Sequence, residues 1–584
     1  MTVQPGSKGS AGLRAADPGW DKHAMETYPA DCCCPFTNPE TVGYVEDNAV
    51  LGTVIMSNIF LSAAITHLAL EAAGCGYLNA EDLDDDPEDC EGLVYGIRPT
   101  NVIPYVVTIG GFVVAMLMPI TGSIMDHTPW RKQICIYSGA VIALVSAAQA
   151  VINKDTWEFV ALLQIASIAS YVVHQLSSGS YLPEIGSTQN ESMKANAWSS
   201  LFMFTTQLGY MFFVSAVSIA VLGGGTVATA AFGQAVCGAS LVVGMGWVFA
   251  RLLRRRDQTQ HIPAGQNAAS AGLYKLASTV KNMRTNYPGT FLYLIGLMFT
   301  EAAMASFASL AQMYIQVQLG ASGIAIASVI VTLLVVAAPT TILAVKMTES
   351  WGEKYGEELG ARRLFVATLL YLAVSTCIAP FVMTGPERFP FVYVASTLCL
   401  CCCCCCCCYA RMLVLLPAPA PVLQQPLLCA RPTTTTTTTT APPTNQLPAS
   451  LRYLFAAIWG VGFGFYYSLN SAVYVYIIPG GEEAKYIGVK LCASNLLNWL
   501  PPLIFTQLNR IFNSVQFGLL VFALFLPIGA LCIALIDMKD ARARVVDSLS
   551  KRQGEGRRAG GDLEMPEMNA VVAPEGERPR APTG

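Results

Sequence analysis

The sequence predicts an all-α integral membrane protein, folded as a bundle of 12 transmembrane helices in two six-helix halves. Of its 584 residues, 53% are hydrophobic and only 13% are charged, whereas an average soluble domain is about 25% charged. The charges cluster and leave uncharged runs of about 20 residues, the length that a helix needs to cross a bilayer. The net charge of −4 gives no bulk basicity of the kind that indicates nucleic-acid binding.

Twelve apolar segments carry the predicted spans. Their length and their lack of alternation favour helices over barrel strands, which are segments of about 10 residues with alternating polarity. We expect the spans at 50–73, 101–125, 133–152, 157–182, 198–222, 226–250, 289–312, 322–345, 364–384, 452–478, 486–508 and 514–537.

A long charged loop divides these spans into two groups of six. A charged loop also lies between the second and third spans of each group, at 126–132 and 346–363, which indicates two repeated halves. The first tail is charged and lacks the apolar core of a cleavable signal. The predicted organisation is a cytosolic N-terminal tail at 1–49, an N-terminal half at 50–250, a cytosolic central loop at 251–288, a C-terminal half at 289–537 and a disordered cytosolic tail at 538–584.

The distribution of basic residues predicts the orientation. Most of the 35 Lys and Arg residues fall in the two tails and in the loops that follow even-numbered spans. The loop after the first span carries instead the acidic run 81–91. Because cytoplasmic loops are enriched in Lys and Arg, we expect both termini in the cytosol and the 74–100 loop on the opposite side.

Residues 397–450 form a low-complexity insertion within the C-terminal half. The insertion contains an unbroken run of cysteines at 401–408, proline-rich sequence, and a run of threonines at 433–440. One interpretation is a retained intron or gene-model error, and the other is a disordered outer loop. A thirteenth span at 391–416 is disfavoured, because it would place the basic C-terminal tail outside.

The cysteines and histidines show no metal-ligand spacing, so neither a metal nor a cofactor is expected. Cys75 and Cys90 share the first outer loop and can form a disulfide if that side is oxidising. The run 32–34 before the first span is either palmitoylated or a solvated patch. The sequence also lacks the HExxH, GxSxG and Walker A patterns, so an enzyme is not expected.

The loop after the second span contains Gly122, Asp126, Arg131 and Lys132 at fixed offsets. Gly122 is expected to permit close helix packing, Asp126 to bond a helix N-terminus or an arginine, and the two cations to hold the cytoplasmic face. This arrangement resembles the conformational loop motif of the major facilitator superfamily, G-x-x-x-D-x-x-x-x-R-[RK]. The bundle is therefore expected to be of the major-facilitator type.

Two further segments narrow the resemblance. Residues 180–185 read Ser-Tyr-Leu-Pro-Glu-Ile, and residues 478–488 contain Pro-Gly-Gly-Glu-Glu-Ala-Lys-Tyr-Ile-Gly. Both resemble segments of the autophagy-related vacuolar amino-acid effluxer family of that superfamily. The sequence departs from the family at its opening motif, which is reduced here to residues 44–49, and at 500–501, where Leu-Pro replaces Gly-Pro.

The resemblance implies a secondary transporter that exports amino acids released by autophagic degradation from a vacuole to the cytosol. It also implies either proton-linked or facilitative transport, and the vacuole membrane as the location, with the plasma membrane as an alternative. A major-facilitator transporter of another metabolite, such as a sugar, an organic anion or a pteridine, stays open. A non-transporting membrane receptor or a membrane enzyme is a more distant alternative.

In this superfamily the substrate cavity is lined by the first, fourth, seventh and tenth helices. The tenth predicted span is the richest in polar residues. Their spacing of i, i+4, i+7, i+8 and i+11 places them on one helical face: Phe463, Tyr467, Asn470, Ser471 and Tyr474. The stripe is either part of a substrate site or a helix-packing surface with interhelical hydrogen bonds.

The other cavity helices add four candidates. In the fourth span, His174 and Ser178 lie on one face, and His174 is either a proton relay or a structural hydrogen-bonding group. Asn58 is the interior candidate of the first span. Glu301 lies near the middle of the seventh, where a charge costs about 2.5–3.5 kcal/mol. Glu301 is therefore expected to couple transport to protons or to bind the substrate ammonium group, the alternative being a protonated structural acid. Lys490 is a candidate partner cation, but it lies only about one turn into its helix and can reach the inner surface.

Overall fold

The computed structural model is helical throughout the residues that it describes, with an isolated bridge between Val94 and Ile97 as its β-pairing there. The described residues are 38–75, 92–185, 189–255, 268–318, 321, 323–383, 450–479, 483–512 and 515–547. The predicted all-α class is confirmed.

The N-terminal half begins with a helix that starts earlier than predicted. Its elements are α1 (Pro39–Ala72), η3 (Pro99–Asn101), α2 (Val102–His127), α3 (Arg131–Gln149), α4 (Trp157–Gly179), α5 (Leu182–Ile185), α6 (Gln189–Val221) and α7 (Thr226–Arg251). The span expected to begin at residue 50 begins at Pro39, because the Asn38 side chain accepts a hydrogen bond from the Glu40 N–H at 3.0 Å and proline occupies the first helical turn. The extra turns carry Asp47 into the bundle, where it is fully buried.

The C-terminal half follows a connecting helix, α8 (Ala268–Asn286), within the predicted central loop. The elements of this half are α9 (Pro288–Val317), α10 (Gly323–Tyr355), α11 (Glu357–Met383), α14 (Ser450–Tyr476), α15 (Glu483–Leu496), α16 (Leu500–Phe512), η6 (Val515–Leu519) and α17 (Leu520–Ala534). The eleventh predicted span is therefore broken into α15 and α16. Pro501 and Pro502 lie in the first turn of α16, where a missing N–H costs no helical hydrogen bond.

Helices occupy all twelve predicted segments, and nine helices in the described part of the chain are long and apolar enough to cross a membrane. The other three predicted spans correspond to α3, to α14 and to the broken pair α15 and α16. Helix α3 begins with two cations, whereas α15 and α16 have only 14 and 13 residues.

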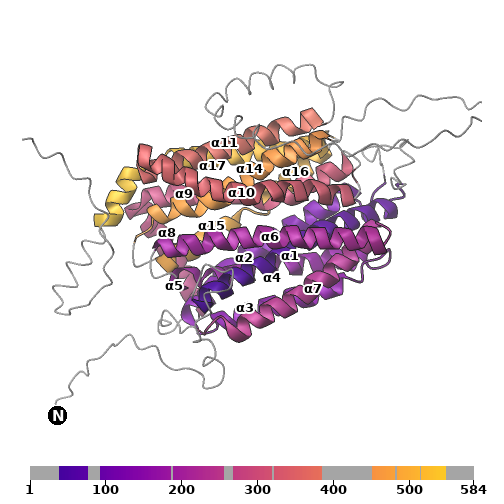
Figure 1. The fold of residues 1–584 in the computed structure, drawn as a ribbon, viewed down its shortest axis with the longest axis horizontal. Coiled ribbons are helices and arrows are strands. Elements are labelled where there is room, and N and C mark those ends of the chain that lie inside the picture. The colour runs from indigo at the N-terminus through magenta and orange to yellow at the C-terminus, as the bar shows by residue number, and fades with distance from the viewer. Residues whose placement is uncertain are drawn as a thin grey trace, which may run out of the picture.

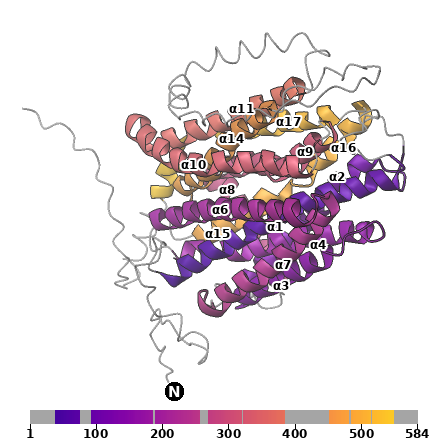
Figure 2. The same ribbon diagram turned by 45° about the vertical axis from the view of Figure 1, so that its right-hand side comes forward.

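The two halves lie side by side in both views, the N-terminal half in indigo to magenta and the C-terminal half in pink to yellow (Figures 1 and 2). In the N-terminal half, α1 packs on α7, α3 on α4 and α7, and α2 on α4. The helices at equivalent positions of the second half pair in the same way: α9 with α17, α11 with α14 and α17, and α10 with α14. This recurrence supports the predicted repeat. The halves meet mainly where α6 packs on α10 and where α2 packs on α15 and α16.

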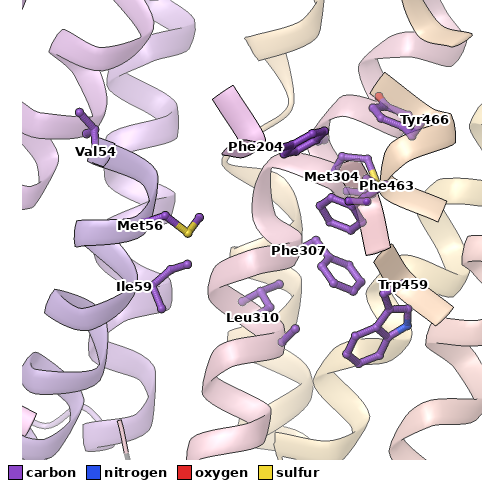
Figure 3. Close-up of a cluster of buried hydrophobic side chains, with 14 of the residues drawn as sticks. Val54, Met56, Ile59, Phe204, Met304, Phe307, Leu310, Trp459, Phe463 and Tyr466 are labelled. Atoms are coloured by element: carbon purple, nitrogen blue, oxygen red, sulfur yellow. The ribbon is translucent and has the colours of Figure 1, made fainter. Parts of the chain in front are cut away.

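An aromatic cluster joins α9 and α14 within the C-terminal half. The Phe307 ring of α9 lies 5.1 Å from Trp459 and 5.0 Å from Phe463 of α14, measured between centroids. Figure 3 shows these rings below Tyr466, with Met56 and Ile59 of α1 pointing from the other half toward α9. Aromatic pairs at this spacing stabilise the α9–α14 contact beyond the effect of area burial.

Both ends of the described chain lie at one end of the bundle. The Arg254 N–H donates to Glu40 at 3.4 Å, which places the start of α1 beside the end of α7. A Cβ built on Gly289, at the start of α9, would lie 2.9 Å from the Cβ of Ala541, which follows α17. The arrangement agrees with an even number of spans, as the charge pattern predicts.

Several predictions concern residues outside the described ranges. The insertion at 397–450 lies outside them except for Ser450, and so do the N-terminal tail up to residue 37, the cysteine run 32–34 and the C-terminal tail from residue 548. Residues 538–547 are helical. Cys75 is in a disulfide, but Cys90 is among the residues not described, so their pairing stays a prediction.

Candidate functional site

Glu301 of α9 is half-buried and lies against α14 in the C-terminal half. The Asn470 side-chain amide donates a hydrogen bond to the Glu301 carboxyl group. The buried Tyr293 hydroxyl donates to the Asn470 side-chain oxygen at 2.6 Å. Because Tyr293 engages the oxygen of that amide, the NH₂ group is directed at Glu301, and the acid is held in a fixed position.

Two more groups approach the same acid. The Tyr466 hydroxyl donates a hydrogen bond to the Thr300 hydroxyl at 3.4 Å and interacts electrostatically with Glu301. Lys490 of α15 interacts electrostatically with Glu301 and lies over the Tyr474 ring, 5.3 Å from its centroid. Of the two possibilities that the sequence leaves open for Lys490, the structure has the inward one, because a tyrosine face and a carboxylate attract its ammonium group.

The predicted stripe on α14 divides between two environments. Asn470 and Tyr474 are buried within the C-terminal half, where the Tyr474 hydroxyl donates to the Tyr486 carbonyl at 2.6 Å. The Tyr467 ring lies 6.0 Å from Phe204 of α6, across the interface between the halves. The side chain of Ser471 is not described.

The candidates of the N-terminal half lie in a different polar environment. His174 and Ser178 of α4 are fully buried, and His174 contacts Asp47 of α1 at 3.2 Å. For the buried Ser178 Oγ and the buried Asn58 Oδ1 of α1, no hydrogen-bond partner is seen among the described residues. Unsatisfied oxygens are costly in a protein interior, so these two are candidates for bonding a ligand.

Hydrogen bonds join the halves at the end of the bundle where α1 and α9 finish. Gln312 of α9 donates to the Ile59 carbonyl of α1 at 2.9 Å, and Gln316, one turn further, donates to the Ala63 carbonyl at 3.0 Å. At the same end, Asn509 of α16 donates to Asn101 at 2.7 Å. This end, predicted to face away from the cytosol, is therefore closed.

The loop motif between α2 and α3 makes only part of the expected contacts. Lys132 donates to the Leu253 carbonyl at 2.6 Å, and the Arg131 guanidinium lies 5.8 Å from the Tyr181 ring centroid, so both cations hold the predicted cytoplasmic face of the N-terminal half. A Cβ built on Gly122 meets no atom within 4 Å, so the expected close packing at Gly122 is not seen. The side chain of Asp126 is not described.

Sequence reasoning missed several groups of these clusters. Asp47 lies in the segment that the sequence analysis assigns to the N-terminal tail. The helical spacing of the polar and apolar residues around it is compatible with an earlier start of the first helix. Tyr293 lies about two helical turns from Glu301, and Tyr466 lies one turn from Asn470. Their polar hydroxyl groups are the sequence feature that could have identified them. Gln312 and Gln316 are polar residues one turn apart on a largely apolar helix, which marks a contact face.

A scan against family models finds one that matches residues 44–385, described as vacuole effluxer Atg22 like. The chain belongs to the Atg22-like vacuole effluxer family. The family match spans the N-terminal half and the second half as far as the end of α11. The resemblance seen at 478–488 lies beyond the matched residues.

The Atg22-like chain also has the fold of solved transporters. It aligns with a D-xylose-proton symporter at a TM-score of 0.50 and 10% identity, over 85% of this chain and 98% of the other. It aligns with the xylose transporter XylE from E. coli, in a partially occluded inward-open conformation, at 0.50 and 10%, over 84% and 97%. No curated protein matches significantly. Family and fold make this chain a membrane transporter of the major facilitator type.

Proposed function

We propose that the chain exports amino acids from a vacuole to the cytosol, and that Glu301 binds the coupling proton or the substrate ammonium group. The family supports the direction and the compartment. The observation that carries the proposal is the cluster around Glu301, in which Asn470 and Tyr466 orient an acid inside a membrane bundle. Ionisable groups at this depth are costly, so a functional role is the default reading.

The charges around Glu301 match a zwitterion. An α-amino acid carries an ammonium group and a carboxylate, and the cluster offers Glu301 and Lys490 as groups of opposite sign. The rings of Tyr293 and Tyr474, 5.2 Å apart, add apolar faces. Tyrosine faces suit aromatic or branched side chains. A sugar has no pair of charges for this arrangement, so the cluster favours amino acids.

Gln312 and Gln316 join α9 to α1 on the side of the bundle predicted to face the lumen. An alternating-access cycle passes through such a conformation in either direction of transport, so the proposed export rests on the family match.

Transport by the purified protein in vesicles tests the proposal. A labelled panel of aromatic, branched and charged amino acids, with a pentose as a competing class, should give net movement of one or more amino acids that is stimulated by a proton gradient. Movement of the pentose alone would contradict the amino-acid assignment, and movement of no solute would contradict the transport function.

Two substitutions then test the role of Glu301. Glu301→Gln keeps an oxygen that can accept from Asn470 but removes the titratable charge, so gradient-driven net transport should be lost while exchange persists. Glu71→Gln, at an exposed acid paired with Lys154, is the matched control and should behave as wild type. If Glu301→Gln keeps the rate and the pH profile of wild type, the coupling role is wrong.

A further inference from the structure

A second ionisable cluster lies in the N-terminal half. His174 of α4 and Asp47 of α1 are both fully buried, and the histidine Nε2 atom lies 3.2 Å from each oxygen of the carboxyl group. We call these two residues the buried pair. It belongs to different helices and to a different half from Glu301. Two ionisable groups are not placed in a bundle core for stability, since removing them from water costs about as much as their attraction returns.

The other ring nitrogen determines what the pair can do. His174 Nδ1 lies 3.0 Å from the Cys135 carbonyl oxygen, which can only accept a hydrogen bond. The Ser138 hydroxyl, 3.1 Å from Nδ1, also lies within donating distance of the carbonyls of Ile134 and Cys135, at 2.8 and 3.1 Å. Nδ1 therefore carries a hydrogen that it donates to Cys135, which leaves Nε2 as the variable nitrogen.

A proton must lie between Nε2 and the carboxyl group. If neither carried one, a nitrogen lone pair would face two anionic oxygens at 3.2 Å, which is repulsive. The contact exists either as imidazolium with carboxylate or as neutral imidazole with carboxylic acid. Both states hold one proton more than a neutral imidazole beside a carboxylate.

The surroundings leave the pair to set its own proton occupancy. Cys135 Sγ of α3 lies 4.0 Å from Nε2, Tyr44 of α1 interacts electrostatically with the carboxylate, and α7 contributes the apolar ring of Phe249. The two cations at the start of α3, Arg131 and Lys132, are directed at the Tyr181 ring and the Leu253 carbonyl.

We propose that Asp47 and His174 form a second proton-binding site, in which one bound proton holds α1 against α4. Loss of this proton turns the contact from attractive to repulsive, so α1 and α4 separate locally. Because α1 also receives the hydrogen bonds of Gln312 and Gln316, the site acts on the helix that closes the lumenal end. The coupling to transport rests on the proposed function, whereas proton binding itself does not.

A metal ion is the competing occupant. Asp47, Cys135 and His174 offer three ligand atoms within 4.8 Å of one another. A metal ion would take the Nε2 lone pair and a carboxylate oxygen as ligands and would replace the hydrogen bond between them. A proton needs only the two residues that are already in contact, and zinc binding is an outcome of the test.

Proton uptake by the purified protein tests the site without a transport assay. Asp47→Asn keeps the shape and lets the amide donate permanently to Nε2, so it imitates the loaded state without titrating. Titrated from about pH 9 to pH 4, a range that covers ordinary imidazole and carboxyl groups, wild type should take up about one proton more per molecule than this variant. Asp155→Asn, at an exposed acid beyond α3, is the matched control and should retain the additional uptake when the two titrations are compared down to about pH 5.5.

The outcomes separate the two proposals. Equal uptake by wild type and Asp47→Asn overturns the site, whether or not the protein transports anything. If Asp47→Asn fails to fold, His174→Gln is measured instead and should show the same loss. In vesicles, Asp47→Asn should lose at least part of the pH dependence of transport while Glu301→Gln loses gradient-driven net transport. Zinc that binds stoichiometrically to wild type and not to Cys135→Ser would replace the proton site by a metal site.

Discussion

The glycines of α14 permit a close approach to α10 that a single methyl group should disrupt. A Cβ built on Gly464 would lie 2.5 Å from the Ala337 carbonyl oxygen and 2.9 Å from the Thr341 nitrogen, both backbone atoms of α10. The Thr340 hydroxyl oxygen would lie only 2.1 Å away. Ordinary contacts of a Cβ begin at 3.4 Å. Backbone atoms cannot rotate aside, so Gly464→Ala must push the two helices apart by about an ångström.

The expected cost is that of overpacking, about 1–3 kcal/mol. Alanine also raises helix propensity by about 1 kcal/mol relative to glycine, so the variant has to be compared with another Gly→Ala change. Gly209 of α6 is exposed, and a Cβ there meets no atom within 4 Å. Gly464→Ala should therefore be less stable than Gly209→Ala by about 1–3 kcal/mol, since the propensity gain cancels.

A third variant grades the effect. Gly462→Ala would meet the Leu372 side chain, 2.2 Å from its Cδ2 atom, and no backbone atom of that helix is among its nearest neighbours. Because a side chain can change rotamer, the loss should be smaller than for Gly464→Ala. Unfolding of the purified variants in mixed micelles of increasing SDS content, followed by tryptophan fluorescence, measures the differences. If Gly464→Ala proves as stable as Gly209→Ala, the result contradicts the inferred backbone contact between α10 and α14.

Two further predictions concern topology and the closed end. Tags at both termini should be cleaved by protease added to the cytosolic side of intact vesicles, and a tag in the 74–100 loop should be protected from it; termini on opposite sides would overturn the even number of spans. Gln316→Leu removes the hydrogen bond to the Ala63 carbonyl, which contributes about 0.6 kcal/mol in a membrane. The ratio of molecules with an open lumenal end to those with a closed one should therefore rise about three-fold. Thiol labelling of an Ala63→Cys background would report this, with Gln175→Leu at an exposed site of α4 as the control.

The sequence by itself determined the class of the molecule and the chain positions of its helices. A bilayer requires every backbone N–H and C=O to be bonded within a helix, so long apolar runs such as 226–250 could be read directly as helices. The cost of a polar group in lipid singled out Glu301 and Asn470 before any contact was known. The loop residues from Gly122 to Lys132 predicted the fold that the comparisons confirm.

The tertiary structure alone decided which of these residues meet. Helical periodicity assigns a residue to a face, but it does not fix the rotation and vertical position of one helix against another. Asn470 lies 169 residues from Glu301, and His174 lies 127 residues from Asp47, so neither contact is encoded locally. The same reason explains the position of Lys490. Its place one turn into a predicted helix is compatible with a location near the surface, whereas helix packing directs its side chain toward Tyr474. Residue type and depth are local properties of a membrane helix, whereas a site is a property of how several helices pack.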